Sequence, residues 1–196
     1  STPRLTVAID ASTDPKGLAD TLTSLAHQTT QFFEIVVVGE VALDGVVLSR
    51  FEELLDLRCA DSNLEGSAGA WNKAISLAQG RWLMYMRAGD VLYPTHVDVL
   101  LTMLSAETPV VCTGLNESLI SYQDDKANVW ARGAKLRNPL DLDQVWAKPV
   151  FPAPAFAHAR SCLDEIGQFD PAFEPLADWE FLLRMATLYP INATDT

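Results

Sequence analysis

The chain has 196 residues, of which 48% are hydrophobic and 20% charged, and this ordinary globular composition excludes intrinsic disorder for its body. Its formal net charge is −12 and its isoelectric point about 4.5, which argues against nucleic acid or an anionic membrane surface as a partner. No apolar run approaches the roughly 18 residues of a membrane helix, so we expect no membrane segment in this chain.

The three cysteines, Cys59, Cys112 and Cys162, are far apart and form no paired framework. Free thiols suit a reducing cytoplasm, which is where we expect the protein. Residues 1–4 lack the apolar core of a signal peptide. The chain is one domain by size, and it could be an excerpt of a longer protein whose other parts reach the inner membrane face.

Strand-like and helix-like patterns alternate along the first 115 residues or so. Short apolar runs predict buried strands at 5–9, 34–38, 57–60, 81–86 and 110–113. Apolar residues at helical spacing predict helices within 18–25, 51–55, 71–78 and 97–104. This alternation predicts an α/β sandwich with a mostly parallel sheet flanked by helices.

The pattern weakens between 116 and 148, where polar and charged residues become frequent. Helical spacing returns over 161–166, where Gly167 is expected to end a short helix, and again over about 178–188.

Polar or small residues directly follow four of the predicted strands, at 10–13, 39–40, 61–66 and 87–90. Ligands bind outside the carboxyl ends of strands in open parallel sheets, so these turns predict one shared crevice. The most informative stretch is 63–75, in which Gly66 and Gly69 permit close backbone approach and tight helix packing. The helix beginning near Ser67 would point free N–H groups at an anionic phosphate. A glycine-containing loop that only caps a core helix is the alternative for that stretch.

An ordered set of motifs resembles family 2 glycosyltransferases of the GT-A fold. Their core signature is similar to Asn63-x-x-Gly66-x-x-x-x-x-Asn72-x-Ala74-Ile75-x-x-Ala78-x-Gly80-Arg81-Trp82-Leu83-x-Tyr85-Met86-x-x-x-Asp90-x-Leu92-x-Pro94, and their second strand to Glu34-Ile35-Val36-Val37-Val38. Their acceptor-side motif is similar to Glu165-Ile166-Gly167-x-Phe169-Asp170-x-x-Phe173 with Asp178-Trp179-Glu180-x-x-Leu183-Arg184. The resemblance spans about residues 5–190. It implies one GT-A domain over 1–196, with a nucleotide-sugar-binding half at 1–115 and an acceptor-side half at 116–196.

The resemblance implies transfer of a sugar, with inversion, from a nucleotide diphosphate donor to the hydroxyl of a glycan, lipid-linked or small-molecule acceptor. A UDP-sugar is the default donor, and cell-surface polysaccharide synthesis the default setting. Asp178 matches the general base, with a helix N-cap as the alternative role. Ala177 stands where the family usually has an acidic residue, and Glu180 is expected to position or stabilise.

Nucleotide contacts are implied for Asp10, Ala11, Ser12, Glu40, Asn63, Gly66, Asn72 and Arg87. The carboxylate of Glu40 would accept a hydrogen bond from the imide N–H of uracil, although a solvated turn residue is an equal reading.

The turn Arg87-Ala88-Gly89-Asp90 departs from the family, which usually has Asp at its first and third positions. Three hypotheses follow. Asp90 with diphosphate oxygens and water could hold Mg²⁺ or Mn²⁺. Arg87 could replace the cation and neutralise the diphosphate itself. The site could also be degenerate, with Arg87 in an ion pair and the domain acting as a nucleotide-sugar-binding or assembly module.

Other classes fit less well, because the glycine-rich loops that nucleotidyltransferases and dinucleotide-dependent oxidoreductases carry after their first strand are missing here. His96 is expected to be solvated, and His158 to lie on the acceptor side. Trp130, Trp146 and Trp179 could stack on sugars, although tryptophan more often fills a core.

Overall fold

The structure, a computed structural model, describes residues 4–12, 15–39, 45–61, 66–123, 126–136, 146–147 and 153–194. A seven-stranded sheet forms its centre, and its strands are, in spatial order, β3 (Leu57–Asp61), β2 (Phe33–Gly39), β1 (Leu5–Asp10), β4 (Trp82–Arg87), β8 (Phe156–Ala159), β5 (Val110–Thr113) and β9 (Asn192–Thr194). Strand β8 runs antiparallel to β4 and β5, and the other neighbouring pairs are parallel.

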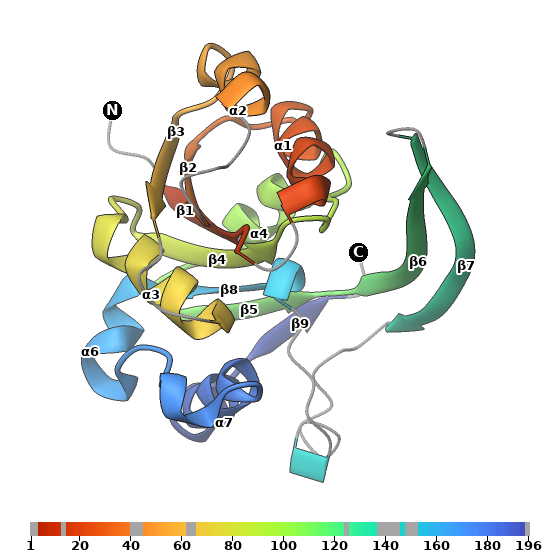
Figure 1. Ribbon diagram of the computed structural model, residues 1–196. Coiled ribbons are helices and arrows are strands. Elements are labelled where there is room, and N and C mark those ends of the chain that lie inside the picture. Colours follow the sequence, from red (N-terminus) through yellow and green to blue (C-terminus); the bar gives the residue numbers. More distant parts are fainter. Residues whose placement is uncertain are drawn as a thin grey trace.

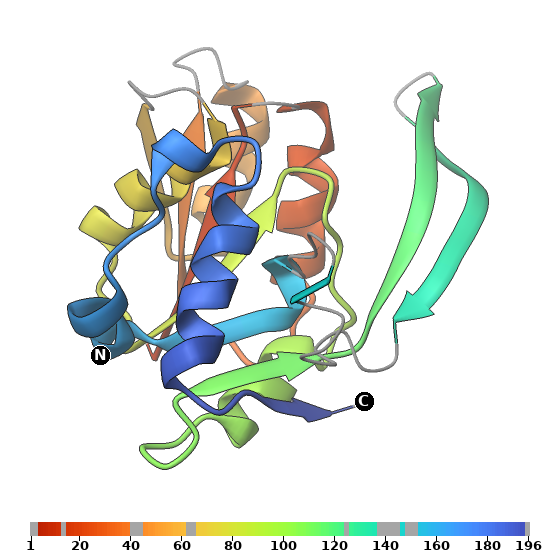
Figure 2. The same cartoon turned by 90° about the horizontal axis from the view of Figure 1, so that it is seen from below.

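Helices cover both faces of this sheet (Figures 1 and 2). One face carries α1 (Leu18–Ala26), α2 (Gly45–Glu52) and α4 (His96–Met103). The other carries α3 (Gly66–Leu77), α6 (Leu163–Ile166) and α7 (Ala177–Leu188). Short 3₁₀ turns lie at η1 (Pro15–Gly17), η2 (Ala153–Ala155), η3 (Arg160–Cys162) and η4 (Pro171–Phe173). The expected α/β sandwich with a mostly parallel sheet is confirmed.

The core lies on both faces of the central strands, since every residue of β1 and β2 is buried. Beneath α3 and α7 it is aromatic. The rings of Phe169 and Phe181 stack with centroids 4.0 Å apart, and Tyr85 meets Phe169 edge-on at 5.0 Å. Trp71 of α3 is fully buried beside them. This aromatic cluster joins the first half of the chain to α7, and so fixes where α7 lies over the sheet.

Several elements were not predicted from the sequence. An antiparallel hairpin of β6 (Leu115–Gln123) and β7 (Lys126–Leu136) occupies most of the stretch where the pattern weakens, and it extends away from the body of the molecule (Figure 2). Strands β8 and β9 were also missed. Leu54, assigned to a helical apolar face, follows the end of α2 and is exposed.

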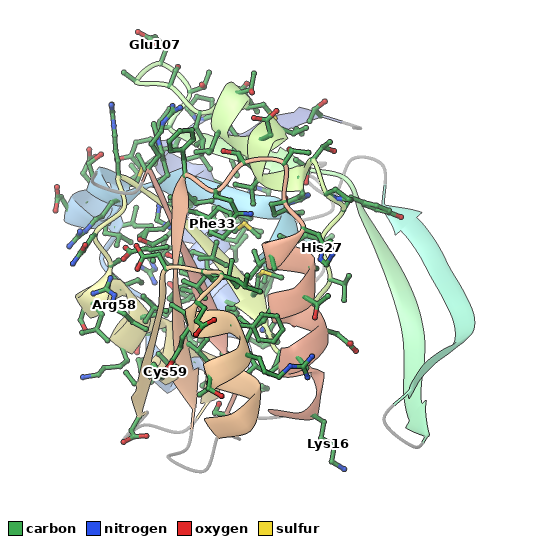
Figure 3. The ribbon with its side chains drawn as sticks, turned by 90° about the horizontal axis from the view of Figure 1, so that it is seen from above. Lys16, His27, Phe33, Arg58, Cys59 and Glu107 are labelled. Carbon is green, nitrogen blue, oxygen red and sulfur yellow. The ribbon has the colours of Figure 1, made fainter. Side chains whose placement is uncertain are left out.

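Glu34 of β2 is a buried carboxylate on the face toward α3. It accepts hydrogen bonds from the Thr6 hydroxyl at 2.6 Å and from the Gln79 and Gly80 N–H groups at 2.5 and 3.0 Å, and it pairs with Arg58 of β3, which Figure 3 labels. Burial alone would raise its pKa, but these hydrogen bonds and the Arg58 charge together lower the pKa of Glu34.

Two histidines are held by hydrogen bonds within the fold. His158 lies in β8 inside the core, with Nε2 2.8 Å from the Tyr85 hydroxyl and Nδ1 2.8 Å from the Ala159 carbonyl oxygen. A carbonyl can only accept, so Nδ1 carries the proton and Nε2 accepts from Tyr85. His96, expected to be solvated, is only partly exposed: its Nε2 donates to the Pro154 carbonyl at 2.7 Å, and burial lowers its pKa.

Candidate active site

The carboxyl ends of β1, β2, β3 and β4 lie at one edge of the sheet, as their parallel pairing requires. Asp10 at the end of β1 stands in register between Val38 of β2 and Arg87 of β4. The expected turns therefore share an edge, although Glu40 and Asn63 lie outside the described residues, so their nucleotide contacts stay predictions.

Asp10 is fully buried, and both of its carboxylate oxygens are engaged by hydroxyl or backbone donors. One oxygen accepts from the Ser12 N–H at 2.9 Å and from the Ser12 hydroxyl at 2.5 Å, and the other accepts from the Ser67 hydroxyl at 2.6 Å. Ala11 is buried, and its N–H continues the sheet to the Val38 carbonyl at 2.8 Å. The Asp10–Ser12 loop is thus fixed against the first turn of α3.

Arg87 reaches from the end of β4 across the site. Its Nη2 lies 2.6 Å from Oδ2 of Asp178, and its Nε donates to the Ser67 hydroxyl at 3.4 Å. Its guanidinium carbon lies 4.7 Å from the centroid of the Trp71 ring, a cation–π contact. The side chain of Arg87 is 37% exposed and that of Asp178 17%, so the pair lies at the boundary between core and solvent.

The turn after β4 is closed by its own last carboxylate. Oδ2 of Asp90 accepts from the Arg87 N–H at 2.7 Å, and burial, opposed by that bond and by the Arg87 charge, raises the pKa of Asp90. The Thr21 hydroxyl holds the turn from α1, because it accepts from the Gly89 N–H at 2.9 Å and donates to the Asp90 carbonyl at 2.8 Å. Gly89 has φ +102°, a conformation that suits glycine.

Asp178 is the second residue of α7 and faces Arg87. Leu176 occupies the N-cap position of this helix, so the alternative role of Asp178 as N-cap is wrong. Glu180 instead pairs with Arg184 one turn later, with Nε 2.5 Å from the carboxylate, which gives it the structural role expected.

The N-terminus of α3 differs from the expectation of an open anion site. Gly66 has φ +84°, and the Ala68 N–H donates to a carboxylate oxygen of Glu174 at 2.8 Å. The positive end of a helix attracts any anion, and here the chain supplies one itself.

Asn72 fastens α3 to the segment around Phe169, which precedes α7. Its amide donates to the Phe169 carbonyl at 2.7 Å and accepts from the Phe169 N–H at 3.0 Å. These bonds give Asn72 a structural role, and a nucleotide contact for it stays a prediction.

The sequence analysis missed Ser67, Trp71 and Glu174 as parts of the site. Ser67 and Trp71 are four residues apart and so share one face of α3. That spacing, together with the position of the helix directly after a predicted ligand-binding turn, could have indicated both residues. Glu174 approaches α3 from more than a hundred residues away, and no local pattern signals that contact.

The donor set at the turn fits a divalent cation poorly. Arg87 and Gly89 supply no carboxylate, and Oδ2 of Asp90 already accepts a hydrogen bond from the Arg87 N–H within the turn. Across the described ranges, no group of three or more His, Cys, Asp or Glu side chains could hold a metal. Hard cations require several oxygen ligands, so most would have to come from donor and water.

The sequence matches the family model described as Glycosyl transferase family 2 over residues 6–157. A PGL/p-HBAD biosynthesis glycosyltransferase of Mycobacterium bovis is 29% identical over 172 residues, which cover 83% of this chain and 62% of that protein. An uncharacterized glycosyltransferase of Haemophilus influenzae is 21% identical over 87% of this chain and 60% of its own length. The chain thus spans less than two thirds of these relatives.

Solved structures share the fold. TarS of S. aureus in complex with UDP aligns with a TM-score of 0.75 and 15% identity, over 98% of this chain and 58% of TarS. The mannosyltransferase PcManGT of Pyrobaculum calidifontis, in complex with GDP-Man and Mn²⁺, gives a TM-score of 0.68 and 18% identity, over 98% of this chain and 55% of its own. The GT-A type of fold is therefore confirmed. Within the described part of the chain, no helix is long and apolar enough to cross a membrane.

Proposed function

Because the chain belongs to glycosyl transferase family 2, we propose that it transfers a sugar from a nucleotide diphosphate donor to an acceptor hydroxyl, with inversion. The observation that carries the proposal is the position of Asp178. A carboxylate from the acceptor-side half lies 2.6 Å from Arg87 at the ligand edge of the donor-side half. A carboxylate so placed can take the proton of a hydroxyl that meets the donor in the same crevice.

The donor binds, in this proposal, at the carboxyl ends of β1 to β4. Asp10, Ala11 and Ser12 line the nucleoside end with Glu40 and Asn63, while Gly66 and Arg87 border the diphosphate. The solved neighbours that hold UDP or GDP-Man support a nucleotide sugar as donor. A UDP-sugar is our first choice.

The reaction moves one proton and one glycosyl group. Asp178 takes the proton of the acceptor hydroxyl while the oxygen of that hydroxyl forms a bond to the anomeric carbon. The bond from that carbon to the diphosphate oxygen breaks, and the nucleoside diphosphate leaves with the electron pair and one more negative charge. That charge requires a cationic partner at the turn after β4.

The acceptor is proposed to be a carbohydrate, a lipid-linked glycan or a small molecule with a free hydroxyl. A role in cell-surface polysaccharide synthesis stays our default, and a relative is named for PGL/p-HBAD biosynthesis. A cytoplasmic location for the transfer, with contact to the inner membrane face through other parts of a longer protein, stays a prediction.

The test measures nucleoside diphosphate release from a panel of UDP- and GDP-sugars, with water or added sugars as acceptors. Wild-type protein should turn over at least one donor, and Asp178→Asn should lower that rate about 10²- to 10⁴-fold. Asp98→Asn is the matched control, because Asp98 is exposed on α4, on the other face of the sheet. If Asp178→Asn keeps most of the activity, Asp178 is not the base.

A second candidate function, a nucleotide-sugar-binding module without turnover, rests on the ion pair between Arg87 and Asp178. In that state the candidate base is engaged by a cation. Calorimetry with UDP, GDP and their sugars separates the two functions. Tight binding without product under every cation tested would favour the module.

A further inference from the structure

The turn after β4 holds a guanidinium where a cation is needed. Arg87 stands in register with Asp10 at the ligand edge, and its guanidinium carbon lies 4.7 Å from the centroid of the Trp71 ring. Asp90, the carboxylate of this turn, accepts a hydrogen bond from the Arg87 backbone. The arrangement therefore presents an organic cation at the site, while the described side chains offer few oxygen ligands for a metal ion.

The partner of that cation is the candidate base itself. Nη2 of Arg87 lies 2.6 Å from Oδ2 of Asp178, and the pair is half-buried. The second carboxylate oxygen of Asp178 accepts from the Trp179 N–H at 2.7 Å. Both oxygens are thus engaged, and an acceptor hydroxyl would have to compete with Arg87 for Oδ2.

A donor diphosphate carries more negative charge than one carboxylate and attracts a guanidinium more strongly, often through two parallel hydrogen bonds. Besides its pair with Asp178, Arg87 makes a cation–π contact with Trp71 and a 3.4 Å hydrogen bond to the Ser67 hydroxyl, and its side chain is 37% exposed.

Resting on the proposed function, we infer that Arg87 is the cation of this site and is exchanged between Asp178 and the donor. Without donor, Arg87 engages Asp178 and holds the base out of use. When the diphosphate binds, Arg87 turns onto it and leaves Oδ2 of Asp178 open to the acceptor hydroxyl. The donor therefore binds before the acceptor becomes reactive, and no divalent cation is needed.

Binding of UDP and of UMP by calorimetry tests this exchange without any turnover. Wild-type affinity for UDP should be the same in EDTA as with Mn²⁺. Arg87→Gln should weaken UDP binding about tenfold or more but leave UMP within a few fold, and Arg87→Lys should lie between, since it keeps the charge without the fork. Circular dichroism checks that each variant is folded.

Asp178→Asn gives the sharper result. It removes the competitor for Arg87, so UDP should bind roughly two- to fivefold more tightly, as expected for a partly exposed ion pair. The same change should have no effect in an Arg87→Gln background, which makes the double-mutant cycle non-additive. Weaker or unchanged UDP binding by Asp178→Asn, or additive effects, would overturn the exchange.

The failures of the two proposals can be told apart. If UDP binding requires Mn²⁺ and ignores Arg87→Gln while transfer still depends on Asp178, the exchange is wrong and the transferase stands. If neither UDP nor GDP binds under any condition, both proposals are overturned.

Discussion

His158 makes the fold sensitive to mild acid, and the size of the effect can be worked out. Burial lowers the pKa of His158 to about 4, despite its bond to the Ala159 carbonyl, against an ordinary value of 6.5. The unfolded chain therefore takes up this proton first as the pH falls. The free energy of unfolding should drop as the pH falls below about 6.5 and level off below about 4. Between pH 7 and 4.5 the linkage amounts to roughly 2 kcal/mol.

Urea denaturation at the two pH values, on the wild type and on His158→Gln, measures this term. Glutamine does not titrate, and its oxygen can still accept from Tyr85. His96, with a pKa also lowered by burial, and Glu34 and Asp90 titrate in both proteins, so the difference between the two pH dependences isolates His158. An equal loss of stability in both proteins would refute the reasoning.

Two substitutions test the supports of the site. Thr21→Val keeps the shape of the side chain but removes the oxygen that accepts a hydrogen bond from the Gly89 N–H. The free energy of unfolding should fall by about 2 kcal/mol, which calorimetry would show as a Tm lower by roughly 4–8 °C. An unchanged Tm would contradict this role of Thr21. Gly66→Ala forces an L residue into φ +84° and sets a Cβ 2.5 Å from the Glu174 carboxylate. Urea denaturation should show that the free energy of unfolding falls by about 1–2 kcal/mol. Gly45→Ala, with no atom within 4 Å of the new Cβ, is its control, and an equal loss there would contradict the explanation.

The first 115 residues were predictable because their signals are local. Strands such as Phe33–Gly39 are buried on both faces and read as continuous β-branched runs, and α1 repeats leucine at helical spacing. The parallel alternation of these elements also predicts that the four turns lie at one edge of the sheet.

The missed strands depend on distant partners. Phe156–Ala159 is four residues long and contains a histidine, so no pattern marks it as the antiparallel strand between β4 and β5. The strands of the hairpin, 115–123 and 126–136, pair with each other and lack the continuous apolar runs of β1 and β2. Pairing between two strands leaves no periodic apolar signal in the sequence unless one face is also buried.

The sequence predicted several residues of the site but not the contacts between them. Spacing and resemblance pointed to Arg87 and to Asp178, which are 91 positions apart, but neither could show that they touch. The aromatic packing of Phe169 and Phe181 under α7 brings them together, and such packing is a property of the whole fold. For the same reason the carboxylate at the start of α3 was not foreseen.

A crystal structure with UDP would test the central claim most directly. The account predicts the diphosphate at the carboxyl ends of β1 and β4, within hydrogen-bond distance of the Arg87 guanidinium, with the Asp178 carboxylate facing it from α7. A nucleotide bound at the opposite edge of the sheet, with Arg87 still paired to Asp178, would contradict it.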